Sequence, residues 1–225
     1  MTLGADFLPR LASALVLAPL ALLITWYGGW PFALLWAAAA LIVLREWAAM
    51  TDMRPRGWAV AGLVYAGTVM LAPVLLRADA MLGLTALFWL FAVVWGTDIA
   101  AYFSGRLIGG PKLWPRVSPK KTWSGALGGS LFGTLAGLAV LHGAGLGFSA
   151  ALVPVTLAVS IASQAGDLFE SAMKRRFGVK DSGALIPGHG GLMDRLDGFV
   201  AAGGLALLLG LMRNPGAPGQ GVLLW

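Results

Sequence analysis

Apolar residues of this chain occur in blocks about twenty residues long, separated by short polar segments rich in glycine and proline. An apolar helix of about twenty residues crosses the roughly 30 Å hydrocarbon core of a bilayer, so each block predicts a transmembrane helix. The Pro- and Gly-rich tail at 214–220 is predicted to be irregular. The fold class is therefore expected to be all-α, a polytopic integral membrane protein with about seven spans. They are expected at about 10–28, 31–50, 57–76, 81–103, 123–142, 147–166 and 197–212.

Composition supports a membrane protein and excludes several chemistries. The 225 residues are 58% hydrophobic and only 12% charged, and the mean hydropathy is +0.80. No cysteine is present, which excludes disulfides, a thiolate zinc site and a cysteine nucleophile. The first apolar block is preceded by a single cation, Arg10, and is followed by no small-residue cleavage site. We expect it to be a retained span rather than a cleaved signal peptide.

The distribution of positive charge predicts the orientation in the membrane. If the N-terminus is inside, every Lys and Arg except Arg77 and Arg213 lies on the inner side, as cytoplasmic loops prefer. Because the cations of this +6 chain border spans, anionic lipids or phosphate substrates are expected partners, and nucleic acid is not. We expect a multi-pass protein of the inner (plasma) membrane whose polar loops, about 104–122 and 167–196, face the cytoplasm. The expected division is 1–96, N-terminal helices, and 97–225, a catalytic region.

The densest group of charges lies between Ser171 and Gly198. A hydrophobic protein of this size does not need so many charges in order to fold, so their concentration indicates a functional site. The segment contains five cations, three aspartates, a histidine and a glycine pair: Lys174, Arg175, Arg176, Lys180, Arg195, Asp181, Asp194, Asp197, His189, Gly190 and Gly191.

Helical spacing predicts two polar stripes in this region. On a helix that emerges from the sixth span, Asp167, Glu170, Ser171 and Lys174 share one face, and Asp194 and Asp197 share a face of the next helix. If the stripes meet, three carboxylates come together, and hard oxygen ligands of this kind suit Mg²⁺. The alternative is that Asp194 and Asp197 are only helix-start acids, favoured by the helix dipole and paired with Arg195.

Two upstream segments also carry unusual polar residues. Asp98, Tyr102 and Arg106 follow one another at intervals of four in an apolar helix, where an ionisable group usually serves function. The alternative is an Asp98–Arg106 link that closes the helix end.

The next loop places two lysines between hydroxyl residues, in the run Ser118, Pro119, Lys120, Lys121, Thr122. Such a group can bind a polyphosphate, or it can be only a basic loop that sets topology. The spacing of a P-loop is missing. His189 lies between glycines, and could act as a general base, a phosphate donor or a residue that locks the loop.

The segment Ser171–Asp197 closely resembles the signature of the phosphatidate cytidylyltransferases, also called CDP-diacylglycerol synthases. The pattern S-x-x-K-R, K-D-x-G, P-G-H-G-G, D-R-x-D is matched throughout. The runs DIAAYFSG from Asp98, SPKKTW from Ser118 and GDLFES from Gly166 also resemble blocks of that family, so the resemblance covers the C-terminal 130 residues or so. One departure is Ser124, where the family usually has Glu, and the chain is short for the family.

The resemblance implies the reaction of CTP with phosphatidic acid to give CDP-diacylglycerol and pyrophosphate, a step of phospholipid biosynthesis. It implies Mg²⁺ at Asp167, Asp194 and Asp197. The catalytic residues expected on this basis are Asp167, Lys174, Arg175, Lys180, Asp181, His189, Asp194, Arg195 and Asp197. The expected substrate-binding residues are Asp98, Tyr102, Ser118, Lys120, Lys121, Thr122, Ser171, Gly190 and Gly191.

Two other functions compete with this interpretation. A CTP-dependent polyprenol or lipid kinase would also use acids and CTP, but would release CDP. A transporter with a basic cytoplasmic vestibule would place charges along a path through the membrane and show repeated halves, whereas here the charges gather on one side. The sequence leaves open whether a second cation such as K⁺ joins Mg²⁺, and whether the chain forms a homodimer.

Overall fold

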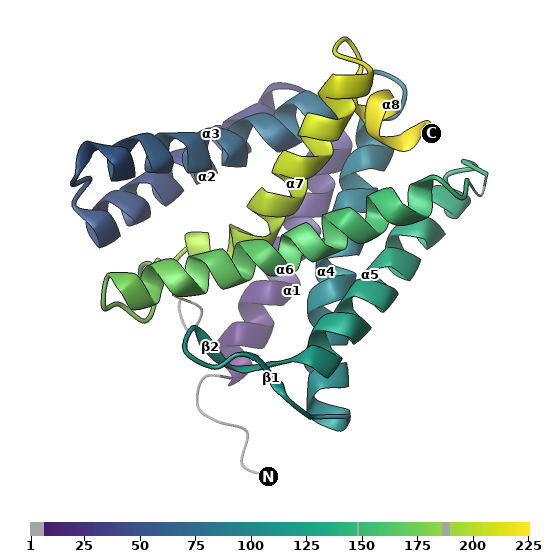
Figure 1. Cartoon of the computed structure of the whole chain (residues 1–225). Coiled ribbons are helices and arrows are strands. Elements are labelled where there is room, and N and C mark those ends of the chain that lie inside the picture. Colours follow the sequence, from purple (N-terminus) through teal and green to yellow (C-terminus); the bar gives the residue numbers. More distant parts are fainter. Residues whose placement is uncertain (1–6, 148, 186–189) are drawn as a thin grey trace.

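The computed structural model describes residues 7–147, 149–185 and 190–225. In this part of the chain the backbone forms long helices, one short C-terminal helix and one β-hairpin (Figure 1). The elements in chain order are α1 (Phe7–Tyr27), α2 (Gly29–Thr51), α3 (Arg56–Arg77), α4 (Gly83–Leu107), β1 (Lys112–Trp114), β2 (Ser118–Thr122), α5 (Trp123–Gly143), α6 (Leu152–Arg176), α7 (Met193–Arg213) and α8 (Pro218–Leu223).

The helices α2 to α7 are each long and apolar enough to cross a membrane. This confirms the predicted class, an all-α polytopic membrane protein. The first predicted span coincides with α1, in which the described apolar stretch is Ala18–Tyr27, so the seventh span stays a prediction. Helix α6 continues to Arg176, ten residues past the predicted end of the span, because its polar residues keep helical spacing.

Glycines allow α4 and α5 to pack closely. A Cβ atom built on Gly133 would lie 2.1 Å from Oγ1 of Thr97, and one built on Gly129 would lie 2.9 Å from the Thr97 carbonyl oxygen. Small residues at a helix interface are typical of membrane bundles, where close backbone approach provides the packing energy. The contact fixes the end of α4, which carries Asp98, against the start of α5.

Glycines also allow α6 and α7 to pack closely near the predicted carboxylates. A Cβ atom on Gly166 would lie 2.5 Å from the carbonyl oxygen of Asp197, and one on Gly198 would lie 2.6 Å from Oγ of Ser163. Because these glycines are the immediate neighbours of Asp167 and Asp197, the two aspartates are brought to the crossing of the helices.

Most charged residues lie at one end of the bundle, where α2, α4 and α6 finish and α3, α5 and α7 begin; we call this the polar end. There the guanidinium of Arg176 lies 5.3 Å from the ring centroid of Trp58, which joins the end of α6 to the start of α3. Helix α8 and the C-terminus lie at the opposite end from the hairpin (Figure 1).

Two local predictions were incomplete or wrong. The loop at about 104–122 contains an unpredicted antiparallel hairpin, in which Lys112 pairs with Thr122 and Trp114 with Ser118. The tail was predicted to be irregular, but α8 begins at Pro218. Proline is favourable in a first helical turn, where its missing N–H is not needed, and the backbone N–H of Gln220 is bound by Asp79 Oδ2 at 2.7 Å.

Candidate active site

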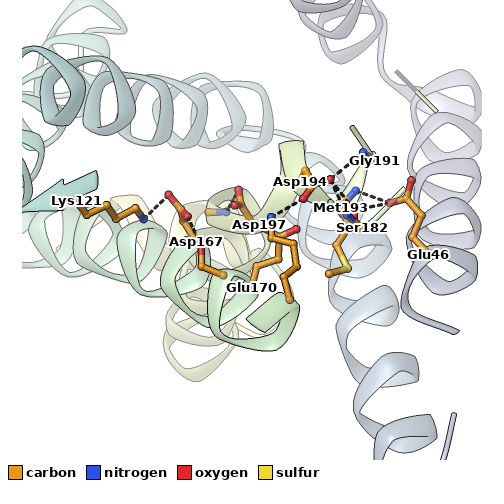
Figure 2. A network of polar contacts seen from close by, with 12 residues as sticks. Glu46, Lys121, Asp167, Glu170, Ser182, Gly191, Met193, Asp194 and Asp197 are labelled. Atoms are coloured by element: carbon orange, nitrogen blue, oxygen red, sulfur yellow. Dashed lines mark hydrogen bonds and ion pairs between the residues drawn. The ribbon is translucent and has the colours of Figure 1, made fainter. Parts of the chain in front are cut away.

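A row of polar side chains from four elements crosses the polar end (Figure 2). Lys121 of β2 lies at one side and Glu46 of α2 at the other. Between them the row contains residues of α6, α7 and the segment that connects these helices. The residues labelled there are Asp167, Glu170, Ser182, Gly191, Met193, Asp194 and Asp197.

Lys121 joins the hairpin to α6. Its Nζ forms an ion pair with Oδ2 of Asp167, and the two side chains are 28% and 34% exposed. Oδ1 of Asp167 accepts a hydrogen bond from Ser171 Oγ at 3.4 Å, one turn further along α6. The lysine loop and the acidic stripe, which were predicted separately, therefore meet.

Asp194 has both carboxylate oxygens engaged. Oδ1 lies 2.5 Å from Nζ of Lys174. Oδ2 accepts hydrogen bonds from Ser182 N at 3.0 Å, Ser182 Oγ at 2.9 Å and Gly191 N at 2.8 Å. Asp194 thus ties the start of α7 to the connecting segment and to α6.

Lys174 bridges Asp194 to Glu170, whose Oε2 lies 3.0 Å from Nζ. The other carboxylate oxygen of Glu170, Oε1, is buried and receives no hydrogen bond from any described donor. Asp197 of α7 lies beside the same part of α6, because its backbone carbonyl oxygen packs against Gly166, four residues before Glu170. Carboxyl groups gathered in this way are stabilised by a proton or a cation between them. Glu170 was noted on the acidic stripe but was not assigned to the site.

Asp98, Arg195 and Asp197 line the same cavity, and Asp167 is paired with Lys121. The described residues contain no preformed group of three or more His, Asp or Glu side chains that would hold a metal by themselves. Oε1 of Glu170, which has no hydrogen-bond partner among those residues, and the carboxylates beside it nevertheless fit Mg²⁺. This ion takes one or two protein carboxylates and completes its shell with water and substrate phosphates.

Glu46 is a site residue that sequence reasoning missed. It is only 7% exposed, and its carboxylate accepts hydrogen bonds from Leu192 N at 2.9 Å and Met193 N at 2.8 Å. One signal could have identified it, because a carboxylate near the end of an apolar block usually has a partner or a function.

The remaining predicted residues are distributed around this row. Tyr102 is exposed and its hydroxyl accepts a 2.6 Å hydrogen bond from Arg106, so Arg106 is linked to Tyr102 rather than to Asp98. Thr122 is buried and its Oγ1 caps α5 by accepting from Gly125 N at 3.1 Å. His189 lies outside the described residues. Most of the other predicted polar side chains are exposed at the polar end, namely Lys120, Arg175, Lys180, Asp181 and Arg195; Ser118 is half-buried.

The packing around Gly190 and Gly191 explains why both positions are glycine. Gly190 has φ +84°, and a Cβ atom there would lie 2.8 Å from Oδ2 of Asp194. A Cβ atom on Gly191 would lie 2.2 Å from Oγ of Ser182. A side chain at either position would displace the groups that hold Asp194.

Ser124, the departure from the family pattern, lies beside the hairpin. Its Oγ is 3.0 Å from Oγ1 of Thr122 and donates to the carbonyl oxygen of Gly109. Ser124 therefore helps to close the hairpin at the start of α5.

Two apolar cavities reach the site from the membrane region, one on each side of α7. A cavity of about 500 Å³ is lined by Trp36, Phe91 and Phe199 and ends at Asp98, Arg195 and Asp197. A second cavity, of about 590 Å³, is lined by apolar residues of α3, α6 and α7 and also reaches Asp197. Charged groups and apolar space thus adjoin at Asp197.

The fold and this site are those of a polytopic membrane protein with its charges gathered at one end, and sequence comparison assigns the family. Residues 56–212 match the pattern of the cytidylyltransferase family, and the chain belongs to it. The phosphatidate cytidylyltransferase of Brucella suis biovar 1 (strain 1330) is 42% identical over 260 aligned positions, covering 93% of this chain and 95% of the relative. The phosphatidate cytidylyltransferase of Staphylococcus aureus (strain COL) is 45% identical over 119 residues, covering 52% of this chain and 46% of the relative.

Proposed function

We propose that this protein transfers the cytidylyl group of CTP to phosphatidic acid, giving CDP-diacylglycerol and pyrophosphate. The observation that carries the proposal is the 42% identity to a phosphatidate cytidylyltransferase along 93% of the chain. The arrangement of the site supports it, because charges suited to phosphates adjoin apolar cavities that can take acyl chains.

The reaction needs no protein nucleophile. A phosphate oxygen of phosphatidic acid attacks the α-phosphorus of CTP, a new P–O–P linkage forms, and the bond to the β-phosphate breaks with release of pyrophosphate. The protein must hold two mutually repelling anions in line and stabilise the charge that develops on the leaving group. We assign this work to five cations of the polar end, namely Lys120, Lys121, Arg175, Lys180 and Arg195.

Mg²⁺ is the cofactor that the carboxylates support. We propose that Asp167 and Asp197 hold it, with Oε1 of Glu170, which lacks a hydrogen-bond partner in the described part of the chain, beside them. When bound, Mg²⁺ would neutralise phosphate charge and act as a Lewis acid. Asp167 makes only a partly exposed ion pair with Lys121 and one 3.4 Å hydrogen bond from Ser171. Asp194 was expected to complete the set, but its buried oxygens bind Lys174 and three donors, so a metal role for it would require exchange of many more contacts. We therefore assign Asp194 to positioning.

The lipid is proposed to enter from the side of the membrane. Phosphatidic acid cannot leave the bilayer, and the two cavities beside α7 provide apolar space that ends at Asp197. Burying acyl chains there stabilises the complex by about 25 cal/mol per Å² of apolar surface. CTP is proposed to reach the same groups from the cytoplasm, the side indicated by the positive charge of the loops.

The test is incubation of purified protein with phosphatidic acid, Mg²⁺ and CTP labelled separately at the α- and γ-phosphates. We expect α-label in the lipid and γ-label in pyrophosphate. Transfer of γ-label to an added polyprenol, with release of CDP, would instead identify a lipid kinase. Absence of label from every lipid would reject both transferase interpretations.

A further inference from the structure

Glu46 reaches from α2 to the first residues of α7, which are almost 150 positions away in the sequence. Oε1 accepts a hydrogen bond from Leu192 N at 2.9 Å, and Oε2 accepts one from Met193 N at 2.8 Å. Oε2 also lies 3.3 Å from the hydroxyl oxygen of Ser182, whose one proton is shared between Glu46 and the closer Oδ2 of Asp194. One carboxylate therefore contacts both the connecting segment and the beginning of α7 (Figure 2).

These contacts supply what α7 lacks at its own N-terminus. The first N–H groups of a helix have no partner within it, and a polar side chain at the preceding residue normally binds one of them. The residue before α7 is Leu192, which makes no side-chain cap. Glu46 provides the acceptor from another helix, and its negative charge is favourable beside the positive end of the helix dipole.

Two glycines of the signature lie directly against the same carboxylate. A Cβ atom on Gly183 would lie 2.8 Å from Oε1 of Glu46, and one on Gly191 would lie 2.8 Å from its Cδ. Two signature glycines therefore leave room for a side chain that lies outside both the signature and the matched segment 56–212.

We propose that Glu46 is a positioning residue for the cytidylyl transfer proposed above, on which this inference rests. It holds the start of α7 and the connecting segment at Ser182 in one arrangement. Arg195 and Asp197 lie within the first two turns of α7, so their positions relative to the reacting phosphates depend on this anchor. Glu46 itself touches no substrate in this proposal and acts through α7.

The matched control is Asp79, a carboxylate of similar burial with the same kind of role at the opposite end. It is 5% exposed and accepts hydrogen bonds from Met81 N at 2.9 Å, Leu82 N at 3.0 Å and Gln220 N at 2.7 Å. Glu46→Gln and Asp79→Asn each replace an acceptor oxygen with an amide nitrogen that cannot accept. Both substitutions should lower the melting temperature in detergent, but only the first disturbs the site.

The experiment measures kcat and both KM values well below the melting temperatures, together with hydrogen–deuterium exchange of the backbone at 190–197. For Glu46→Gln we expect kcat to fall about 10- to 100-fold, as loss of alignment does, with KM values changed less and exchange at 190–197 accelerated. For Asp79→Asn we expect wild-type kcat and wild-type exchange at 190–197. Glu46→Asp keeps the charge but is one methylene shorter, and should give an intermediate kcat.

The inference is wrong if Glu46→Gln keeps wild-type kcat, or if both variants lose activity in proportion to their loss of stability. If Glu46→Gln does not fold, Glu46→Asp decides by the same criteria. Failure of the proposed function is recognised separately, because the wild-type protein would then make no labelled CDP-diacylglycerol. The exchange at 190–197 would still report whether Glu46 anchors α7.

Discussion

Three of the buried or nearly buried carboxylates bind backbone N–H groups at or just before the starts of helices. Glu46 binds those of Leu192 and Met193 at the start of α7. Asp194 binds that of Gly191 two residues before α7, and Asp79 binds that of Leu82 just before α4. A buried charge is tolerated only where hydrogen bonds or an opposite charge replace water. In this protein the same physical role is therefore found both at the candidate site and at the far end.

Asp194→Asn should affect both folding and activity. The substitution removes the charge that pairs with Lys174 and places an amide nitrogen where Ser182 and Gly191 donate. Breaking a buried ion pair typically destabilises by about 3–5 kcal/mol. We expect a clearly lower melting temperature and loss of turnover in the labelled-CTP assay. A variant with wild-type stability would show that these contacts do not hold the start of α7.

Lys121→Ala should act on nucleotide binding more than on folding. Its ion pair with Asp167 is partly exposed, and such pairs contribute at most about 1 kcal/mol. A charge-assisted bond to a phosphate contributes about 1.5–3 kcal/mol, so we expect the KM for CTP to rise about tenfold or more. Lys112→Ala, an exposed lysine of β1, is the control and should leave KM unchanged. Equal effects of both variants would indicate only a loss of general positive charge.

At the scale of elements, α7 is the helix on which the site depends. It begins in the network of Glu46 and Asp194, it carries Asp197, and the two cavities lie along its sides. Its last residue, Arg213, donates a hydrogen bond to the carbonyl oxygen of Gly221 in α8 at 3.0 Å, and its guanidinium lies 4.0 Å from the ring centroid of Trp225. A shift of α7 would therefore move Asp197 and the walls of both cavities together.

The contact between α8 and the start of α4 should make stability depend on pH. Burial acts to raise the pKa of Asp79, but hydrogen bonds from Leu82, Gln220 and Met81 outweigh it, so that the pKa lies below its ordinary value. A lowered pKa means that Asp79 contributes stability fully above the unfolded pKa of about 4 and loses it as pH falls through the folded value. We expect the melting temperature of the wild type to fall more steeply than that of Asp79→Asn below about pH 4. Parallel curves for the two proteins would contradict this.

In the whole molecule, most charged side chains gather at the polar end, apart from the apolar parts of the helices. Lys121 and the carboxylates labelled in Figure 2 lie at one end of the helices, and the hydrophobic cavities extend from there along α7. Such an arrangement suits a reaction between one water-soluble and one membrane-bound substrate. Both can meet at the interface without crossing the bilayer.

Sealed vesicles test the orientation of this arrangement. CTP does not cross a bilayer, so the protein can use it only on the side that the polar end faces. We expect inverted inner-membrane vesicles to form labelled CDP-diacylglycerol from external CTP, and right-side-out vesicles to do so only after permeabilisation. Activity in intact right-side-out vesicles alone would reverse the orientation deduced from the positive loops.

The sequence by itself determined the class of protein and most of its helices. Apolar blocks of span length predict helices in any bilayer protein, because the backbone must satisfy its own hydrogen bonds there. The charged segments between them were equally visible, and the stripe of Asp167, Glu170 and Ser171 followed from helical spacing alone. The signature was recognised from local runs of residues.

Only the tertiary structure decided which of these residues meet. The partners of Glu46 and Asp194 lie on other helices or in the connecting segment. Thr122 caps α5, and Ser124 helps to close the unpredicted hairpin. Helix periodicity describes one helix at a time. The crossing of α6 and α7, set by Gly166 and Gly198, determines which carboxylates face each other and which bind backbone.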